Sequence, residues 1–510
     1  MDIEFKTYPV EFKHKNRDKR SIASEIYGNR FHADQTLYEY LIEFLLIFVS
    51  EDDEGENPKE ALKFHDPNAS GNLFYKVQPR MGLKRFIFFD KNKKNDAAEI
   101  DKVAYEKMIE VLKEKIEDCE EEEKTEILEA LQDLLHGYAV VLKKRTWCAQ
   151  AMLPLCPEVI FCEAMPKKNE RKTLTWNECF FNDNNKKRED IDSKFDFDKR
   201  NFLARGGELY YLHILQGLQG QPQKQKILEA LFKEQLVEKG EKISQIANFV
   251  QDAWEEYMEY PEHPTKRLGI SFIPENAYKS IAADSVDELI NYMSCRMHPV
   301  KKIELLSKGV MIQILRMLSV ATTNYLEQQR ECWIMDISGN TGNVVKKIAA
   351  NSFNDVQGSF TTAIGKNTQA DDTAERLKLI RKARKDSFDI FKSKGKELRC
   401  IIPTSGPYER FSLPEDCMRF LVIALIEPQK KMTVEMFLDK LYEKYRIVIG
   451  PNQFKHMNNL DTIADVALAN SFHENVLAFQ DFLKATGFLR ELSDATSIVI
   501  NPYEKLKGAE

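Results

Sequence analysis

The sequence predicts a mainly α-helical, multidomain α+β protein in which a large helical body precedes a smaller C-terminal domain of helices and a hairpin. Apolar residues recur at helical spacing through most of the chain. The 510 residues are too many for one ordinary core and correspond to about three domains of roughly 150 residues each. With 43% apolar and 30% charged residues, the composition is that of a folded, charge-rich chain rather than a disordered one.

Charge and hydropathy narrow the classes of function. The net charge of -7 is small for this length, so an argument for nucleic-acid binding depends on local patches. No run reaches the roughly 18 uninterrupted apolar residues of a membrane span, and the first residues lack the order of a secretory signal. The nine cysteines, odd in number and scattered, fit a reducing compartment. We expect a cytoplasmic protein without a membrane partner.

We divide the chain into four regions. Residues 1–165 are expected to form an N-terminal domain that is first mixed α/β and then helical, and residues 166–200 a charged surface insertion. Residues 201–400 are expected to form a central helical domain that ends in a basic helix. Residues 401–510 follow as the C-terminal domain, after the turn residues Thr404–Tyr408.

The N-terminal domain is expected to contain a buried helix over residues 37–48, capped by Asp34 or Thr36. The run Lys84–Asp90 has four consecutive apolar residues between charges and is predicted to be a strand. Residues 96–142 have a helical pattern, which an acidic run near residue 120 interrupts at a solvated tip.

The cysteines do not predict a metal site. Trp147–Cys162 carries three cysteines separated by eight and six residues, whereas structural zinc usually takes paired cysteines two to four residues apart. No such pair occurs in the chain, so small buried thiols are the simpler interpretation. We expect no cofactor.

The stretch Arg205-Gly-Gly-Glu208 marks the start of the helical middle. Its two glycines can supply backbone angles that other residues resist, and a helical pattern follows. Arg205 and Glu208 are therefore either a ligand contact at a helix start or a buried charge pair that holds a corner of the fold. The structural interpretation is favoured, because ion pairs often position charges without a function.

The central domain is expected to be a series of helices, over residues 221–239, 242–259, 286–297 and 303–326. Trp333–Asn343 is a strand-like run that passes into a glycine-rich turn and a helical stretch over residues 344–350. It lacks the Gly-Lys-Ser/Thr ending of a P-loop and the three-glycine dinucleotide fingerprint, so we interpret it as a turn.

A basic helix ends this domain, and Asp371 or Asp372 can cap it. Between Arg376 and Arg399 the sequence has ten basic and three acidic residues. Such a helix can neutralise phosphates without reading base sequence, although a solvated helix face is the competing interpretation. The candidate nucleic-acid contacts here are Arg376, Lys378, Arg381, Lys382, Arg384 and Lys385.

In the C-terminal region, helices are expected over residues 416–426 and 434–445 and again before Gly487, and a hairpin over residues 488–500. This order resembles a winged-helix domain. The resemblance implies a helix for the major groove and a hairpin wing against the phosphates, although winged helices also dock proteins. It adds further candidate contacts, Lys484 and Arg490 and, more loosely, Lys455 and His456.

The helical body, the basic helix, this tail and the stretches Arg205–Glu208 and Trp147–Cys162 together resemble accessory proteins of prokaryotic phage-defence or DNA-restriction systems. The resemblance implies a non-catalytic DNA-contacting or scaffold subunit that works with a separate ATPase or nuclease. The missing P-loop, paired-histidine motif and nucleophile elbow agree with this. Two alternatives stay open: a metal-dependent nuclease with dispersed carboxylates, such as Glu163 and Glu170 near Lys172, and a transcriptional regulator.

Overall fold

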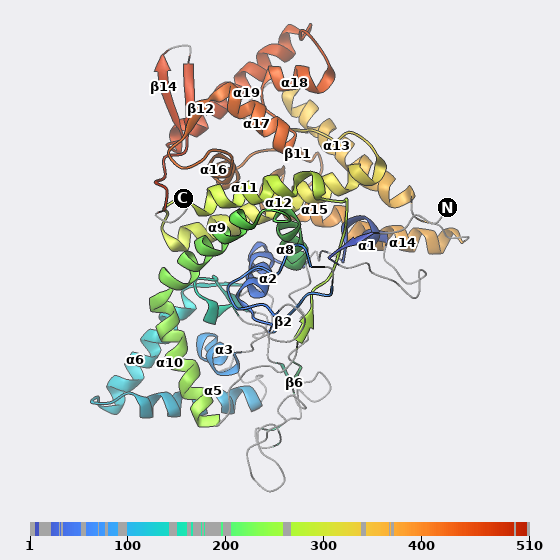
Figure 1. Cartoon of the computed structure of the whole chain (residues 1–510). Helices are drawn as coiled ribbons and strands as arrows, with labels where there is room; N and C mark the ends of the chain where they lie inside the picture. The colour runs from blue at the N-terminus through green and yellow to red at the C-terminus, as the bar shows by residue number, and fades with distance from the viewer. Residues whose placement is uncertain are drawn as a thin grey trace.

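The computed structural model describes residues 6–9, 22–29, 31, 34–52, 58–69, 71–76, 80–89, 99–141, 150–160, 165–166, 175, 178, 195–196, 206–258, 267–337, 343–366, 368, 372–493 and 496–506. In these residues helices dominate and the strands are short, which confirms the predicted mainly α-helical fold class (Figure 1).

The helices are α1 Ile22–Tyr27, α2 Leu37–Val49, α3 Met81–Ile87, α5 Glu99–Lys115, α6 Glu121–His136, α8 Gly206–Gly217, α9 Pro222–Lys233, α10 Glu241–Met258, α11 Lys279–Met293, α12 Pro299–Leu326, α13 Asn343–Lys366, α14 Thr373–Lys385, α15 Phe388–Glu397, α16 Glu415–Leu425, α17 Val434–Tyr445, α18 Pro451–Asn458 and α19 Val466–Ala485. A π-helical turn, Glu234–Glu238, continues α9, and Pro157–Val159 forms a 3₁₀ turn.

The strands are β1 Thr7–Tyr8, β2 Phe74–Lys76, β3 Ala139–Val141, β4 Ala151–Met152, β5 Met165–Pro166, β6 Phe195–Asp196, β7 Arg267–Gly269, β8 Ile273–Pro274, β9 Trp333–Ile334, β10 Ile401–Ile402, β11 Arg410–Phe411, β12 Lys431–Thr433, β13 Ile447–Val448, β14 Leu489–Ser493 and β15 Thr496–Ile500. Most form antiparallel pairs (β1 with β8, β2 with β7, β3 with β4, β5 with β6, β10 with β11), β9 and β13 pair in parallel, and β12, β15 and β14 form one three-stranded sheet in that order.

Helices α2, α8, α11 and α12 form the centre of the main core. Thr36 caps α2 with a complete capping box, so of the two predicted caps Thr36 is the one used. α12 is long and apolar enough to cross a membrane by length and composition, but 94% of its most apolar window is buried inside the fold. The cluster of buried side chains around these helices runs from Tyr8 to Val499, so N-terminal, central and C-terminal residues share one core.

A second core joins α3, α5, α6 and α10, and it corrects one prediction. Lys84–Asp90 is not a strand: residues up to Ile87 belong to helix α3, while Asp90 lies outside the described residues. Leu83, Phe86 and Phe88 are all fully buried. A short apolar run that is covered on every side has no periodicity to distinguish helix from strand, which explains the error.

The C-terminal region contains the predicted helices α16 and α17, and Thr433 caps α17 by accepting a hydrogen bond from the backbone N–H of Met436. The predicted hairpin is β14–β15, and Gly487 precedes it with a φ of +80°. The buried side chain of Asn475 on α19 donates to the carbonyl oxygens of Met335 and Ile449, 2.9 Å each. These hydrogen bonds fix α19 onto the β9–β13 pair.

Candidate nucleic-acid interface

Helix α14 forms the exposed basic surface that the sequence predicts. Asp372 caps it by accepting a hydrogen bond from the backbone N–H of Ala374, 3.1 Å away. Only Ala383 is buried, and Ile380 is half-buried, so little of the helix faces the core. All six predicted contacts are exposed, namely Arg376, Lys378, Arg381, Lys382, Arg384 and Lys385.

Five of these six cations form no ion pair with any residue that the structure describes. The sixth is Arg384, whose Nε lies 3.2 Å from Asp389 Oδ1 and whose guanidinium lies over the Phe388 ring. Two carboxylates, Asp372 and Glu375, lie at the N-terminal end of the helix, away from its last two turns. α14 therefore keeps an excess of positive charge in solvent.

The cations of α14 are ordered on its surface. Lys378, Arg381 and Lys385 are spaced three and four residues apart and so share one outward face, which we call the basic row. Leu377, 49% exposed, lies next to this row on the helix surface. The face can thus offer several charges at once to an extended polyanion.

In the second half of the predicted basic run, the three lysines are already paired with carboxylates. On α15, Lys392 and Lys396 both contact Glu409 Oε1, at 2.6 and 2.9 Å. Burial raises the pKa of Glu409, but these two hydrogen bonds outweigh it and lower the pKa to about 2. Lys394 pairs with Glu397 at 2.8 Å. Of the basic run, α14 and the exposed Arg399 are the parts left for a partner.

The C-terminal candidates present a weaker positive surface. Lys484, at the end of α19, lies 2.8 Å from Glu491 on β14, and Arg490 is exposed beside it. The exposed face of α19 also carries Glu474 and Asp481. Because Glu474, Asp481 and Glu491 offset Lys484 and Arg490, this surface has no excess of positive charge to attract phosphates.

The structure does not bring the two sets of predicted contacts together. α14 packs against α13, α15 and α1. Figure 1 places α14 at one end of the upper half of the molecule, near the N-terminus, and the β14–β15 hairpin at the other end. In a winged-helix domain, one helix and the wing contact the same stretch of DNA. The basic row and Arg490 lie too far apart to contact one short ligand in that way.

The predicted pair Arg205 and Glu208 is described only in part, because Arg205 lies outside the described residues. Glu208 is fully buried and accepts hydrogen bonds from Tyr75 Oη, at 3.1 Å, and the backbone N–H of Ser271, at 3.3 Å. These contacts favour a structural role for Glu208, in line with the simpler interpretation of the sequence.

The neighbouring glycines permit a close helix contact rather than a sharp turn. Both lie within α8, without positive φ. A Cβ atom on Gly206 would lie 2.2 Å from the Tyr40 ring, and one on Gly207 would lie 2.4 Å from the Tyr40 carbonyl oxygen. The predicted reason for the glycines was therefore wrong: they let α8 approach α2 closely.

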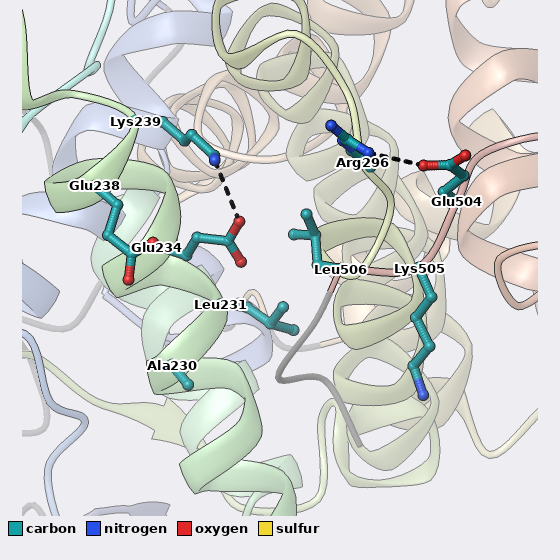
Figure 2. A pocket seen from close by; sticks show the side chains of 9 residues that line it. All are labelled: Ala230, Leu231, Glu234, Glu238, Lys239, Arg296, Glu504, Lys505 and Leu506. Atoms are coloured by element: carbon teal, nitrogen blue, oxygen red, sulfur yellow. Dashed lines mark hydrogen bonds and ion pairs between the residues drawn. The ribbon is translucent and has the colours of Figure 1, made fainter.

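A surface pocket of about 570 Å³ lies between the π-helical turn after α9 and the last described residues (Figure 2). Three carboxylates and three cations line it, and two ion pairs already join four of them: Arg296 with Glu504 at 2.9 Å and Lys239 with Glu234 at 3.8 Å. Because these charges balance, the pocket has no excess charge to select an anionic or cationic ligand.

The residues proposed for a nuclease site, Glu163, Glu170 and Lys172, lie outside the described residues. Within the described ranges, no group of three His, Cys, Asp or Glu side chains is placed to hold a metal ion. The glycine-rich stretch that was interpreted as a turn, residues 338–342, also lies outside the described residues, and α13 begins directly after it.

Sequence reasoning missed a buried charge cluster that fixes the C-terminal region to the body. Arg316 on α12 is fully buried and lies 3.0 Å from Glu288 Oε1 on α11. Its guanidinium lies over the Tyr445 ring of α17, 4.4 Å from the centroid, and Tyr445 Oη donates to Glu288. Partners 28 and 157 residues apart leave no local signal in a sequence. The one local sign is that Arg316 stands within a long apolar segment.

No family model matches this chain, and neither the curated proteins nor the solved structures contain a match.

Proposed function

We propose that this protein is a non-catalytic, DNA-contacting scaffold subunit of a multi-protein DNA-processing or anti-phage defence system, and that α14 makes the DNA contact. The observation that carries this proposal is the free positive charge of α14, where five exposed cations have no partner among the described residues. Elsewhere in the basic run, nearby carboxylates hold the lysines. A helix with many exposed positive charges attracts a polyanion such as DNA.

Duplex DNA fits the dimensions of this surface. A 13-residue helix is about 20 Å long, and duplex DNA carries one charge per roughly 1.7 Å of its axis. The basic row with Arg384 and Lys382 can reach several phosphates, and contacts to phosphates carry no base-sequence information. We expect binding that is independent of sequence and sensitive to salt.

For the C-terminal region we propose a winged-helix-like module that docks a protein, such as the separate ATPase or nuclease subunit. The order α16, β12, α17, α19, β14, β15 and the strand order β12-β15-β14 support the resemblance. Strand β13 and helix α18 are inserted between α17 and α19. The carboxylates Glu474 and Asp481 on α19 favour a protein over DNA at the face that would otherwise enter the major groove.

The DNA proposal is tested by reversing the centre of the basic row. We expect Arg381→Glu with Lys385→Glu to weaken binding to a random duplex of about 25 base pairs at least about tenfold at about 50 mM NaCl. The slope of log affinity against log salt should also become shallower by about 2, because each lost phosphate contact removes roughly 0.9. Fluorescence anisotropy across a salt series measures both quantities.

The matched control is Lys346→Glu with Lys347→Glu, which makes the same charge change at two exposed lysines near the start of α13. Its affinity should stay within about twofold of the unchanged protein, because the two lysines lie on another helix, outside the basic row, and exposed charges act weakly on a ligand that they do not contact. Equal affinities for all three proteins, or an equal loss in both variants, would remove α14 as the DNA contact.

A further inference from the structure

Helix α6 is the acidic counterpart of α14. Its 16 residues include six carboxylates, and Lys124 is their one lysine or arginine. Glu122, Glu126, Glu129 and Asp133 are exposed and spaced by four, three and four residues, so they form one row along the helix. None of these four has an ion pair within the described part of the chain. We call them the acidic row.

An exposed apolar row lies beside the acidic row. Ile127 is 38% exposed and Leu134 is 44% exposed, and Ala130 lies between them with the same helical spacing. The inner face of α6, with Leu128 and Leu135, already packs in the second core. α6 thus has a second apolar face that no described residue covers.

The surfaces of α6 and α14 match in kind and size. Each has a charged row next to exposed apolar side chains: the acidic row beside Ile127 and Leu134, and the basic row beside Leu377. The helices are about 24 Å and about 20 Å long, from 16 and 13 residues. A contact between them would pair opposite charges along its whole length and cover apolar groups on both sides.

The two helices cannot meet within one molecule. In Figure 1, α6 lies at the lower left end of the molecule and α14 at the right. α6 packs against α5 and α3, whereas α14 packs against α13, α15 and α1. A contact between α6 and α14 must therefore join two copies.

We infer that the acidic face of α6 docks onto the basic face of α14 in a second copy of this chain. The contact is head-to-tail, since it uses two different surfaces, so one copy is left with a free α14 and the other with a free α6. Such a contact builds a ring where the rotation closes and an open filament where it does not. In the assembly, the α6 carboxylates take the place of DNA phosphates on α14, so DNA and self-association compete.

Analytical ultracentrifugation of the full-length protein at about 50 µM tests this, in about 50 mM and about 500 mM NaCl, because salt screens exposed ion pairs. We expect species above the 59.3 kDa of one chain in low salt and the single chain in high salt. Glu126→Gln with Asp133→Asn and Ile127→Ser, the α6 variant, should stay a single chain in both. So should Arg381→Glu with Lys385→Glu, the α14 variant.

Mixing the two variants is the decisive measurement. The α6 variant keeps an intact α14, and the α14 variant keeps an intact α6, so the pair can form one contact and no more. We expect a complex of one copy each in low salt, at twice the mass of one chain, although neither variant associates alone. A control with Lys346→Glu and Lys347→Glu should associate like the unchanged protein.

Three results would overturn the inference: a single chain for the unchanged protein in low salt, association that survives in the α6 variant, or a mixture that contains only single chains. The DNA proposal is tested separately, because the α6 variant leaves α14 unchanged. If that variant is a single chain and binds duplex DNA, self-association and DNA binding both hold. If it is a single chain and does not bind DNA, only the DNA proposal fails.

Discussion

Arg316 on α12 and Arg381 on α14 carry the same guanidinium group in opposite surroundings. Arg316 is fully buried, with Glu288 at 3.0 Å and the Tyr445 ring 4.4 Å from its guanidinium carbon. Arg381 is exposed and has no ion pair among the described residues. A buried charge has lost its water and is tolerated only with partners, whereas a solvated charge loses little by being left alone. The buried guanidinium of Arg316 stabilises the fold, whereas the exposed guanidinium of Arg381 is free to bind another molecule.

The junction around Arg316 shows what the buried kind does. It joins α11, α12 and α17, and Lys444 extends it with a 2.7 Å contact to Asp284. Arg330 adds hydrogen bonds to the carbonyl oxygens of Lys444 and Tyr445, at 3.2 and 2.8 Å. The C-terminal region is thus held on the body by charged groups as well as by apolar packing.

The largest loss of stability is expected from a substitution that breaks the junction around Arg316. Arg316→Met leaves Glu288 buried without its cation, and removing one partner of a buried ion pair typically costs about 3–5 kcal/mol. Urea unfolding at pH 7 measures the free energy of unfolding. The control is Lys107→Met, which removes an exposed pair with Glu110, 2.7 Å apart, and should change stability by less than about 1 kcal/mol. Equal costs for the two variants would contradict the comparison.

The second largest effect is on the pH dependence of stability, and it depends on His213. This side chain is fully buried near the same junction, and its Nε2 lies 2.8 Å from Ser285 Oγ. Burial, and to a lesser extent the positive charge of Arg316, lowers the pKa of His213 to about 3. The usual pKa of histidine is 6.5. Between pH 6.5 and pH 3, His213 is therefore protonated in the unfolded chain but stays neutral in the folded chain. Stability must fall as the pH falls through this window.

His213→Gln should make the pH dependence of stability shallower in that window, by up to about 1.4 kcal/mol per pH unit for one proton. Urea unfolding at a series of pH values gives the slope, which a general loss of packing does not change in the same way. An unchanged slope in the variant would show that His213 takes up its proton in the folded state.

The sequence could predict what depends on neighbouring residues. Thr36, one of the two predicted caps of α2, the acidic tip between α5 and α6, and the hairpin after Gly487 all follow from local chemistry, and the structure contains them. The basic helix α14 was also predicted, because its charges are consecutive in the chain.

What depends on distant contacts could not be predicted. Lys84–Asp90 was assigned as a strand because nothing local reveals that other helices cover this run on all sides. α13 extends to Lys366, well beyond the predicted residue 350, because packing against α12 and α19 supports a sequence with weak periodicity. That Glu409 neutralises Lys392 and Lys396 is likewise set by the fold, and it leaves most of the free positive charge of the predicted basic run on α14.

The smallest change in stability is expected when exposed cations of α14 are removed. Arg381→Ala with Lys385→Ala removes two solvated side chains without described ion-pair partners, so the free energy of unfolding should change by less than about 0.5 kcal/mol. The same variant should weaken duplex binding, because the lost charges are those that face outward. Urea unfolding and anisotropy on one preparation measure both. A large loss of stability would mean that the basic row serves the fold, as Arg316 does, and that its exposed charge is not held for a partner.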